Sequence, residues 1–237
     1  MQYNDATLLN HEGLLEYLQG FITERRRDLI EQVLSQRTRQ LTVVLENIYH
    51  PPNASAVIRT CDCFGLQDLH VIADQKRFRA NADVVQGAAK WVDIQRYAAI
   101  EEDNTTLCLQ KLKADGYKIA ATTLRQEKYT PLDQIPCQEK IAVCLGCEET
   151  GLSDTAHQEA DYFVHVPMYG FTESFNISVC AALILQQLTA RLRQGSVEQW
   201  GLQEHEKQIL RMRWTRKSLK HADHLIQRYL LDHDIQR

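Results

Sequence analysis

A buried strand, a turn and a helix follow one another in residues 41–64, LTVVLENIYHPPNASAVIRTCDCF. The first six residues are apolar almost throughout, which is typical of a strand covered on both faces of a parallel sheet. Pro51 and Pro52 predict a turn, and Asn53 is expected to cap the helix that follows. Apolar residues recur at helical spacing in residues 54–64. This stretch therefore predicts one strand–helix unit of an α/β protein.

Apolar runs of the same kind recur along the chain. They lie at residues 69–73, 117–123, 140–146 and 162–166, with a shorter run at 91–94. Helical patterns at residues 105–114 and 178–193 alternate with them, which predicts a parallel sheet with helices on both faces. We expect a basic helical extension at residues 1–40, a central domain at 41–195, and a second basic helical extension at 196–237. Loops are expected at residues 74–81, 125–138 and 195–202.

The charge of the chain is distributed unevenly. The net charge of the 237 residues is −4, which argues against a simple nucleic-acid-binding protein. Basic residues nevertheless gather at the two ends: residues 25–39 contain five arginines, and residues 205–228 contain seven Lys or Arg against Glu206 and Asp223. Such clusters suit contact with phosphate, but they are equally typical of solvated helix faces.

Two classes of protein are disfavoured by the sequence. No apolar run approaches the roughly 20 residues that cross a bilayer, and the first residues do not resemble a secretory signal, so we expect a cytoplasmic protein. Seven cysteines are present. We expect them to be reduced, because their number is odd and most lie in apolar segments. Cys144 and Cys147 have the spacing of a zinc or redox pair, but Cys61 and Cys63 are the only other close pair, and we predict no metal.

Polar residues and glycines follow three of the predicted strands, at the ends where doubly wound α/β proteins bind ligands. In residues 46–60, Asn53 and Arg59 are expected to face the mouth of a site. In residues 145–154, LGCEETGLSD, Gly146 and Gly151 would let the backbone approach a ligand closely.

The third such segment is residues 164–178, VHVPMYGFTESFNIS. Ser174, Asn176 and Ser178 crowd the start of the next helix. One residue suffices to cap a helix, so the surplus of polar residues indicates a site.

Together these segments resemble the SpoU/TrmH family of RNA ribose 2′-O-methyltransferases, which belongs to the SPOUT class. Asn53, Ser55 and the run Arg59-Thr-Cys-Asp match its first motif. Gly146-x-Glu148-x-x-Gly151 matches the second, and Pro167-Met-x-Gly170-x-x-x-Ser174-Phe-Asn176-Ile-Ser-Val179 matches the third. The resemblance spans about residues 20–195.

The resemblance implies a sheet whose C-terminal part forms a trefoil knot, an exception to the usual unknotted topology. It also implies a homodimer without a metal, and S-adenosylmethionine bound in a bent shape by the knot loops. The implied cofactor-binding residues are Thr122, Leu145, Gly146, Cys147, Val166, Met168, Gly170 and Phe175.

The catalytic residues that the resemblance implies are Arg59, Asn53, Glu148, Ser174 and Asn176. An arginine is essentially never deprotonated, so we expect Arg59 to anchor a phosphate and to stabilise the developing alkoxide. Asn53 would position Arg59 and the ribose. Glu148 would hold a motif loop or the substrate, and Ser174 and Asn176 would fix the third loop.

The basic N-terminal helix and the segment Arg191-x-Arg193-x-Gly195 resemble the family members that methylate the D-loop guanosine at position 18 of tRNA. The implied RNA-binding residues are Arg25, Arg26, Arg27, Lys90, Arg191, Arg193, Arg211 and Arg213. Two alternatives remain open. One is the same reaction on ribosomal RNA or on the tRNA wobble nucleotide, and the other is a non-catalytic RNA-binding protein with this fold.

Overall fold

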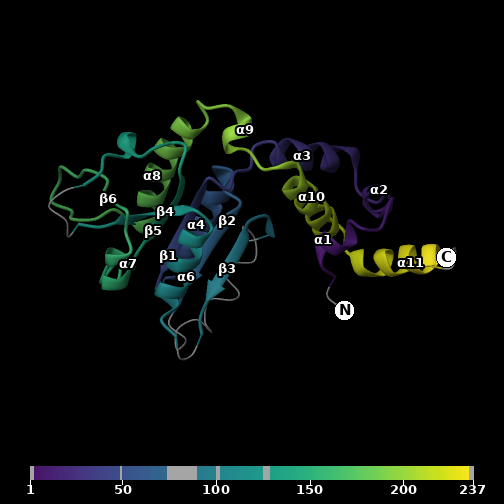
Figure 1. Ribbon diagram of the computed structural model, residues 1–237, viewed down its shortest axis with the longest axis horizontal. Coiled ribbons are helices and arrows are strands. Elements are labelled where there is room, and N and C mark those ends of the chain that lie inside the picture. Colours follow the sequence, from purple (N-terminus) through teal and green to yellow (C-terminus); the bar gives the residue numbers. More distant parts are fainter. Residues whose placement is uncertain (1–2, 49, 74–89, 100–101, 125–128, 235–237) are drawn as a thin grey trace. The chain divides into compact units, whose positions relative to one another are not determined.

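The computed structural model describes residues 3–48, 50–73, 90–99, 102–124 and 129–234 (Figure 1). These residues form two compact units. Residues 38–200 make the α/β unit, and the residues before and after them together make a helical unit. We expected a central domain with two separate extensions. The chain instead has two units, because the N-terminal and C-terminal extensions pack together as a single helical unit.

The α/β unit is built on a parallel sheet whose strands run in the order β3-β2-β1-β5-β4-β6. The strands are β1 (Leu41–Glu46), β2 (Asp68–Ile72), β3 (Asp93–Tyr97), β4 (Tyr117–Thr122), β5 (Lys140–Leu145) and β6 (Tyr162–Val164). The predicted parallel α/β sheet is confirmed. Strand β1 is buried along its whole length, as its apolar sequence predicts, because it lies inside the sheet between β2 and β5.

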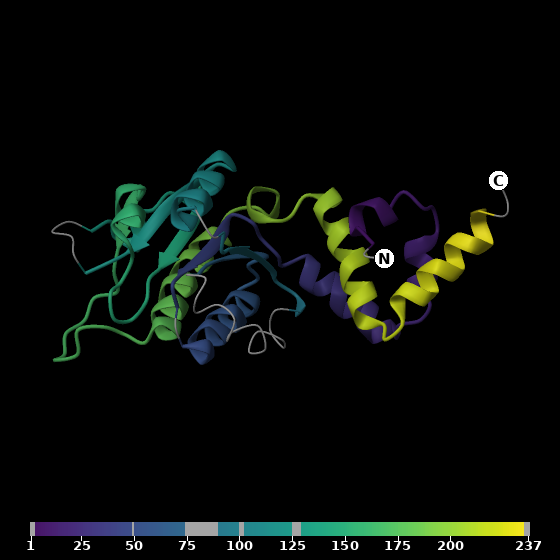
Figure 2. The ribbon, with the colours of Figure 1, turned by 90° about the horizontal axis from the view of Figure 1, so that it is seen from below.

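Helices cover both faces of this sheet, as Figure 2 shows. On one face, α4 (Pro51–Cys63) and α8 (Ile177–Leu192) pack on the side chains of Leu41, Val43 and Leu45. On the other face, α6 (Asn104–Ala114) and α7 (Asp154–Gln158) pack around Val44 and the neighbouring strands. The two cores follow from the alternation of side chains along each strand. Two short helices, η2 (Leu132–Gln134) and α9 (Val197–Trp200), lie in segments that we expected to be loops.

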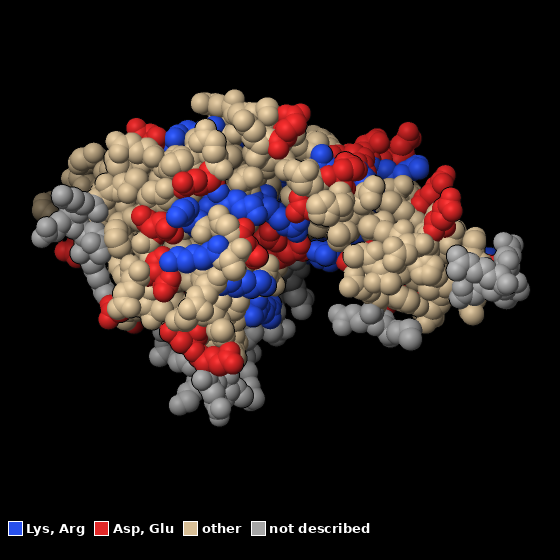
Figure 3. Space-filling view, in the orientation of Figure 1, with Lys and Arg blue, Asp and Glu red and all other residues tan. Residues whose placement is uncertain are grey.

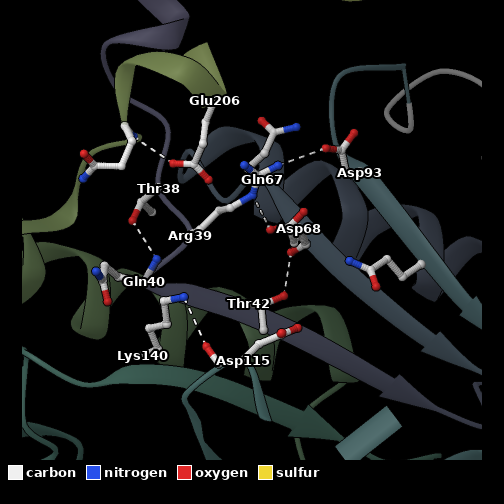
Figure 4. A network of polar contacts seen from close by, with 12 residues as sticks. Thr38, Arg39, Gln40, Thr42, Gln67, Asp68, Asp93, Asp115, Lys140 and Glu206 are labelled. Atoms are coloured by element: carbon white, nitrogen blue, oxygen red, sulfur yellow. Dashed lines mark hydrogen bonds and ion pairs between the residues drawn. The ribbon is translucent and has the colours of Figure 1, made fainter. Parts of the chain in front are cut away.

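A polar network joins the amino ends of the strands (Figure 4). The Arg39 guanidinium lies 2.7 Å from the Asp68 carboxylate and 3.3 Å from that of Asp93. The Thr42 hydroxyl donates to the main-chain oxygen of Asp68 at 2.8 Å, and the Tyr117 hydroxyl donates to that of Arg39 at 2.7 Å. These contacts hold the strands together at their amino ends. The carboxyl ends of the strands, at the opposite side of the sheet, are where parallel α/β sheets bind ligands.

The helical unit consists of residues from both ends of the chain. Its helices are α1 (Asp5–Leu8), α2 (Leu14–Gln19), α3 (Glu24–Leu34), α10 (Glu204–Ser218) and α11 (Ala222–Asp234). Leu14 and Leu18 of α2 share a buried core with Met212 of α10 and Ile226 of α11. Each extension alone has too little apolar surface for a core, so the two fold together.

The boundaries between the units also differ from the predicted ones. The main-chain oxygen of Thr38 accepts from the amide of Gln67, and the Thr38 hydroxyl donates to the oxygen of Trp200 at 2.6 Å. Thr38 and Trp200 therefore belong to the α/β unit, so its boundaries are at 38 and 200 and not at 41 and 195.

One detail of the first motif was predicted wrongly. Asn53 does not cap α4, because the helix begins at Pro51 and His50 occupies the cap position. Proline favours the first turn of a helix, where its missing amide is not needed, so both prolines are helical. Asn53 lies in that first turn, and its side chain is available for contacts outside the helix. The predicted loop at residues 74–81 lies outside the described residues.

Candidate functional site

A pocket of about 370 Å³ lies at the carboxyl edge of the sheet, among the turns that follow β4, β5 and β6. The turn after β5 contributes residues 145–152, and the segment leading to α8 contributes Glu173, Ser174 and Phe175. Parallel α/β sheets bind ligands at this edge. The second and third motifs therefore meet in a cavity large enough for a small organic molecule.

The predicted cofactor-binding residues line this pocket, with one exception. The lining includes Thr122, Leu145, Gly146, Cys147, Val166, Met168 and Phe175. Gly170 is absent from the lining, and a Cβ added there would find its nearest neighbour 4.0 Å away. Nothing in the described structure requires a glycine at this position.

A chain of hydrogen bonds joins the three motifs. The Asn53 amide nitrogen donates to the Glu148 carboxylate, and the Asn53 amide oxygen accepts from Asn176 at 3.1 Å. The oxygen of Asn176 in turn accepts from the main-chain amide of Ser178 at 2.9 Å and from its hydroxyl at 2.6 Å. Asn176 thereby caps α8. The structure brings together residues that are 95 and 123 positions apart in the sequence.

Close backbone packing shapes the turn of the second motif. A Cβ at Gly146 would lie 2.2 Å from the carbonyl carbon of Gly151 and 2.3 Å from the nitrogen of Leu152. Gly151 has a φ of +71°, and its amide donates to the Cys147 oxygen at 2.9 Å. Both glycines were expected to let the backbone approach a ligand. Both line the pocket, and Gly146 also lets the turn close on itself.

A polar network that was not predicted from the sequence lies behind this turn. Ser153 caps α7, and its hydroxyl and amide both donate to the buried carboxylate of Glu46, at 2.7 and 2.8 Å. Nδ1 of His157 donates to the Ser153 main-chain oxygen, and Nε2 lies 2.9 Å from the Thr123 hydroxyl. Both His157 and Thr123 line the pocket. The only available signal was a charged residue, Glu46, at the end of an apolar strand.

Arg59 lies on α4 and is exposed, outside the lining of the pocket. Its guanidinium makes no hydrogen bond or ion pair with any residue that the structure describes. Of the predicted catalytic residues, Glu148 and Ser174 line the pocket and Asn53 and Asn176 hold its walls together. Arg59 is the predicted catalytic residue that neither lines the pocket nor bonds to its walls.

Two of the predicted RNA-binding arginines hold the main chain of the α/β unit. The guanidinium of Arg191 donates to the oxygens of Leu132 and Ile135, which fixes η2 on α8. Arg193 donates to the oxygen of Phe64 at 3.1 Å and lies over the Trp200 ring. Burial lowers the pKa of Arg193 from its ordinary value. These contacts give both arginines a structural role.

Arg211 and Arg213 of the helical unit are paired with carboxylates from α3 and α1. Arg211 donates twice to Glu31, at 2.6 and 2.7 Å, and this bonding raises the pKa of its guanidinium. Arg213 lies 2.8 Å from Asp5, which Arg216 also contacts. The positive field of the C-terminal cluster is therefore partly neutralised.

Arg25, Arg26 and Arg27 are exposed at the start of α3. They form an exposed basic cluster on the helical unit. Lys90 of the α/β unit is also exposed, and its ammonium group lies 4.9 Å from the centre of the Trp91 ring.

Basic and acidic side chains are interspersed on the face shown in Figure 3. In the α/β unit, Lys113 pairs with Glu159 at 2.6 Å and Lys118 with Asp161 at 3.1 Å. Exposed pairs of this kind contribute little to stability, but they reduce the net field of the surface. The number of basic residues alone is therefore a poor measure of phosphate binding.

All seven cysteines are free thiols. Over the described ranges, no group of three or more His, Cys, Asp or Glu side chains is arranged to hold a metal ion. None of the described helices is both long and apolar enough to span a membrane.

The parallel sheet, the pocket at its carboxyl edge and the three joined motifs define an α/β protein with a small-molecule site. Residues 40–186 match the SpoU rRNA Methylase family. The chain therefore belongs to this family, as the motifs predicted.

Individual relatives agree with this assignment. The chain is 40% identical over 216 residues to a tRNA (guanosine(18)-2'-O)-methyltransferase of Borreliella burgdorferi, covering 91% of this chain and 94% of the relative. It is 33% identical to the protein of the same name from Thermus thermophilus, covering 82% and 98%. Among solved structures, the TrmH/SpoU tRNA modifying enzyme of Aquifex aeolicus matches 83% of this chain and 98% of its own, with a TM-score of 0.70 and 28% identity.

Proposed function

We propose that this chain transfers a methyl group from S-adenosylmethionine to the ribose 2′-hydroxyl of guanosine 18 in tRNA. The observation that carries the proposal is the hydrogen-bonded link from Glu148 through Asn53 to Asn176 beside the pocket. This link joins all three family motifs. The relatives with 33–40% identity across most of the chain bear the name of this activity.

The pocket suits S-adenosylmethionine. Leu145, Val166, Met168 and Phe175 offer apolar surface for an adenine ring, and the tight turn at Gly146 forms another part of the lining. When bound, the cofactor would supply a methyl group already activated by its sulfonium centre. No metal is needed for this transfer, so the chain has to align the ribose oxygen and assist the loss of its proton.

Arg59 is the residue that we assign to the RNA side of the reaction. Its guanidinium is exposed and makes no ion pair with a described residue, so it is available to a phosphate. From there it would stabilise the charge that develops on the ribose oxygen. Asn53, six residues earlier on α4, would set the position of this helix relative to the pocket wall.

We also propose that the chain works as a homodimer. Val179 and Leu183 of α8 are 45% and 42% exposed, and Phe175 beside the pocket is 40% exposed. Apolar residues grouped in this way next to a site are typical of an interface. Because Arg59 is absent from the pocket lining of its own chain, we propose that a second copy on this face supplies the arginine of its α4.

Leu183→Asp tests this interface, with Leu107→Asp as the matched control. Leu107 is a leucine on α6 of similar exposure, 39%. We expect the Leu183 variant to elute as a monomer and to lose methyl transfer, and the Leu107 variant to keep both properties. Equal elution and equal activity of the two variants would remove the proposed interface.

The C-terminal trefoil knot is likewise a proposal. After β6, the chain continues into α8, which packs on α4 and on η2 in the connection between β4 and β5. This packing is compatible with a C-terminal segment threaded through that connection. Pulling the unfolded chain from both ends would test it, because a knotted chain remains shorter than its full contour length.

We propose that Arg25, Arg26 and Arg27 supply the main phosphate contacts with tRNA in the cytoplasm. Their exposure favours them over Arg211 and Arg213, whose charges are shared with carboxylates. Lys90 is a further candidate. Replacing the three α3 arginines by alanine is expected to weaken tRNA binding. The number of counterions released on binding, measured from the slope of log K against log salt concentration, should fall by up to about three. An unchanged salt slope would contradict this role.

The activity itself is tested with labelled S-adenosylmethionine and unmodified tRNA, followed by mapping of the methylated nucleotide. A transcript with 2′-deoxyguanosine at position 18 is the matched control, since it lacks only the accepting oxygen. We expect label on the first transcript and none on the second. Methylation of the wobble nucleotide or of ribosomal RNA instead would identify a different substrate. Failure to methylate any RNA would support a binding protein.

A further inference from the structure

The buried carboxylate of Glu46, at the carboxyl end of β1, has no part in the mechanism described above. Only 1% of this residue is exposed. Its carboxylate accepts three hydrogen bonds, two from the hydroxyl and amide of Ser153 and one from the hydroxyl of Thr105 at 2.5 Å. The main-chain amide of Ser153 can only donate, so the Glu46 oxygen that it contacts is an acceptor.

No cation compensates this charge among the residues that the structure describes. Glu46 has no ion pair there, and Lys111, which lies on the same helix as Thr105, donates to Gln95 instead. A buried charge with hydrogen bonds but no counterion creates a negative field in its surroundings. Burial raises the pKa of the nearby Cys108 thiol to about 12, and the Glu46 carboxylate adds to that shift.

The charge lies directly behind the cofactor pocket. Ser153, which Glu46 holds, follows the run of residues 145–152 that lines the pocket. Through His157, the same network reaches Thr123 on another wall. The cofactor carries a positive sulfonium, whereas the product left after methyl transfer, S-adenosylhomocysteine, is a neutral thioether. A fixed negative charge behind the pocket therefore acts differently on the two ligands.

We infer that Glu46 is a positioning residue with an electrostatic role: it holds the turn after β5 through Ser153 and favours the cationic cofactor over the neutral product. The inference rests on the proposed function, because it requires S-adenosylmethionine in this pocket. It assigns ligand discrimination to a residue outside the pocket lining.

Glu46→Gln tests the inference, because it removes the charge and keeps the shape. The measurement is the Kd of S-adenosylmethionine and of S-adenosylhomocysteine by calorimetry, without RNA. Two unit charges about 10 Å apart in an effective dielectric of about 20–40 interact strongly enough to change affinity roughly four- to fifteenfold. We therefore expect the ratio of the product Kd to the cofactor Kd to fall by that factor. Sinefungin, which carries an ammonium group in place of the sulfonium, is expected to behave like the cofactor.

Thr105→Val is the matched control, since it removes one hydrogen bond and keeps the charge. We expect both of its Kd values to change together and their ratio to stay within about twofold. Glu46→Asp keeps the charge as well and is expected to retain most of the wild-type ratio. If Glu46→Gln does not fold, Glu46→Met provides an uncharged side chain of similar length.

The outcomes separate the inference from the proposed function. A wild-type chain that binds neither ligand would refute the proposed function. A wild-type chain that binds both, together with a neutral Glu46 variant that weakens them equally or not at all, would overturn the electrostatic role. A ratio that falls in the neutral variants alone would establish it.

Discussion

The glycine at position 146 allows a sharp test of how the cofactor turn is built. Gly146→Ala adds a single methyl group. In the structure, that carbon would lie 2.2, 2.3 and 2.5 Å from three main-chain atoms of Gly151 and Leu152. Non-bonded carbons in proteins approach to about 3.5 Å, so the opposite strand of the turn has to move by about 1 Å. Main-chain atoms cannot rotate away as a side chain can.

The expected cost follows from this geometry. Overpacking by one methyl group costs about 1–3 kcal/mol, and three rigid contacts place Gly146→Ala near the upper limit. For a unit of this size, a loss of about 3 kcal/mol lowers Tm by roughly 6–12 °C. The displaced turn also lines the pocket, so we expect affinity for S-adenosylmethionine to fall at least about tenfold.

Two other glycines provide graded controls. Gly151 has open space for a Cβ but a φ of +71°, so Gly151→Ala is expected to cost about 1 kcal/mol through backbone strain. Gly170 has neither a close contact nor a positive φ, so Gly170→Ala should leave stability unchanged or slightly raised. Calorimetric unfolding and the Kd of the cofactor measure all three variants. If the order of destabilisation were not 146, then 151, then 170, the reasoning would be refuted.

Three further predictions concern other parts of the chain. Arg59→Ala is expected to keep its affinity for the cofactor and to lose at least about 100-fold in turnover, which is the scale of one catalytic electrostatic contact. If the variant methylated RNA at the wild-type rate in single-turnover assays, Arg59 would have no part in the reaction. Asp5→Asn removes the charged partner that Arg213 and Arg216 share, and it should destabilise the helical unit by about 1–2 kcal/mol. The Kd of the cofactor should not change, and a loss of cofactor binding would show that the effect extends beyond the helical unit. Burial lowers the pKa of His70 to about 4, so the unfolded chain binds a proton below pH 6.5 that the folded chain excludes. The free energy of unfolding should therefore fall by roughly 2–3 kcal/mol between pH 6.5 and pH 4.5, and His70→Phe should lose this dependence in urea titrations; an equal slope in both proteins would contradict the assignment.

The sheet was largely predictable because its strands are short apolar runs with clear ends. Residues 41–46 and 117–122 form strands close to the predicted limits, since buried parallel strands need apolar side chains on both faces. The edge strand β3 was the hardest strand to predict from the sequence, because its residues are only partly buried. Its sequence, DIQRY, lacks the continuous apolar pattern because only part of each side chain is covered.

Charge was the least predictable property. The basic cluster in residues 205–228 suited either phosphate contact or solvated helix faces. In the structure Glu31 and Asp5, from the other end of the chain, pair with three of its arginines. A sequence shows how many charges a segment has, but the partner of each charge depends on which segments pack together. The same holds for Arg191, whose main-chain acceptors lie 59 and 56 residues away.

The candidate site shows which kind of polar residue the sequence does reveal. Ser174, Asn176 and Ser178 together exceed what a helix cap needs. In the structure Asn176 both caps α8 and joins the third motif to Asn53, and Ser178 bonds to Asn176. Glu46 attracted none, although a buried carboxylate is costly and persists only where several donors satisfy it. A charged residue that ends an otherwise apolar strand is therefore a signal in its own right. At the carboxyl edge of a parallel sheet it indicates a polar network under the binding site.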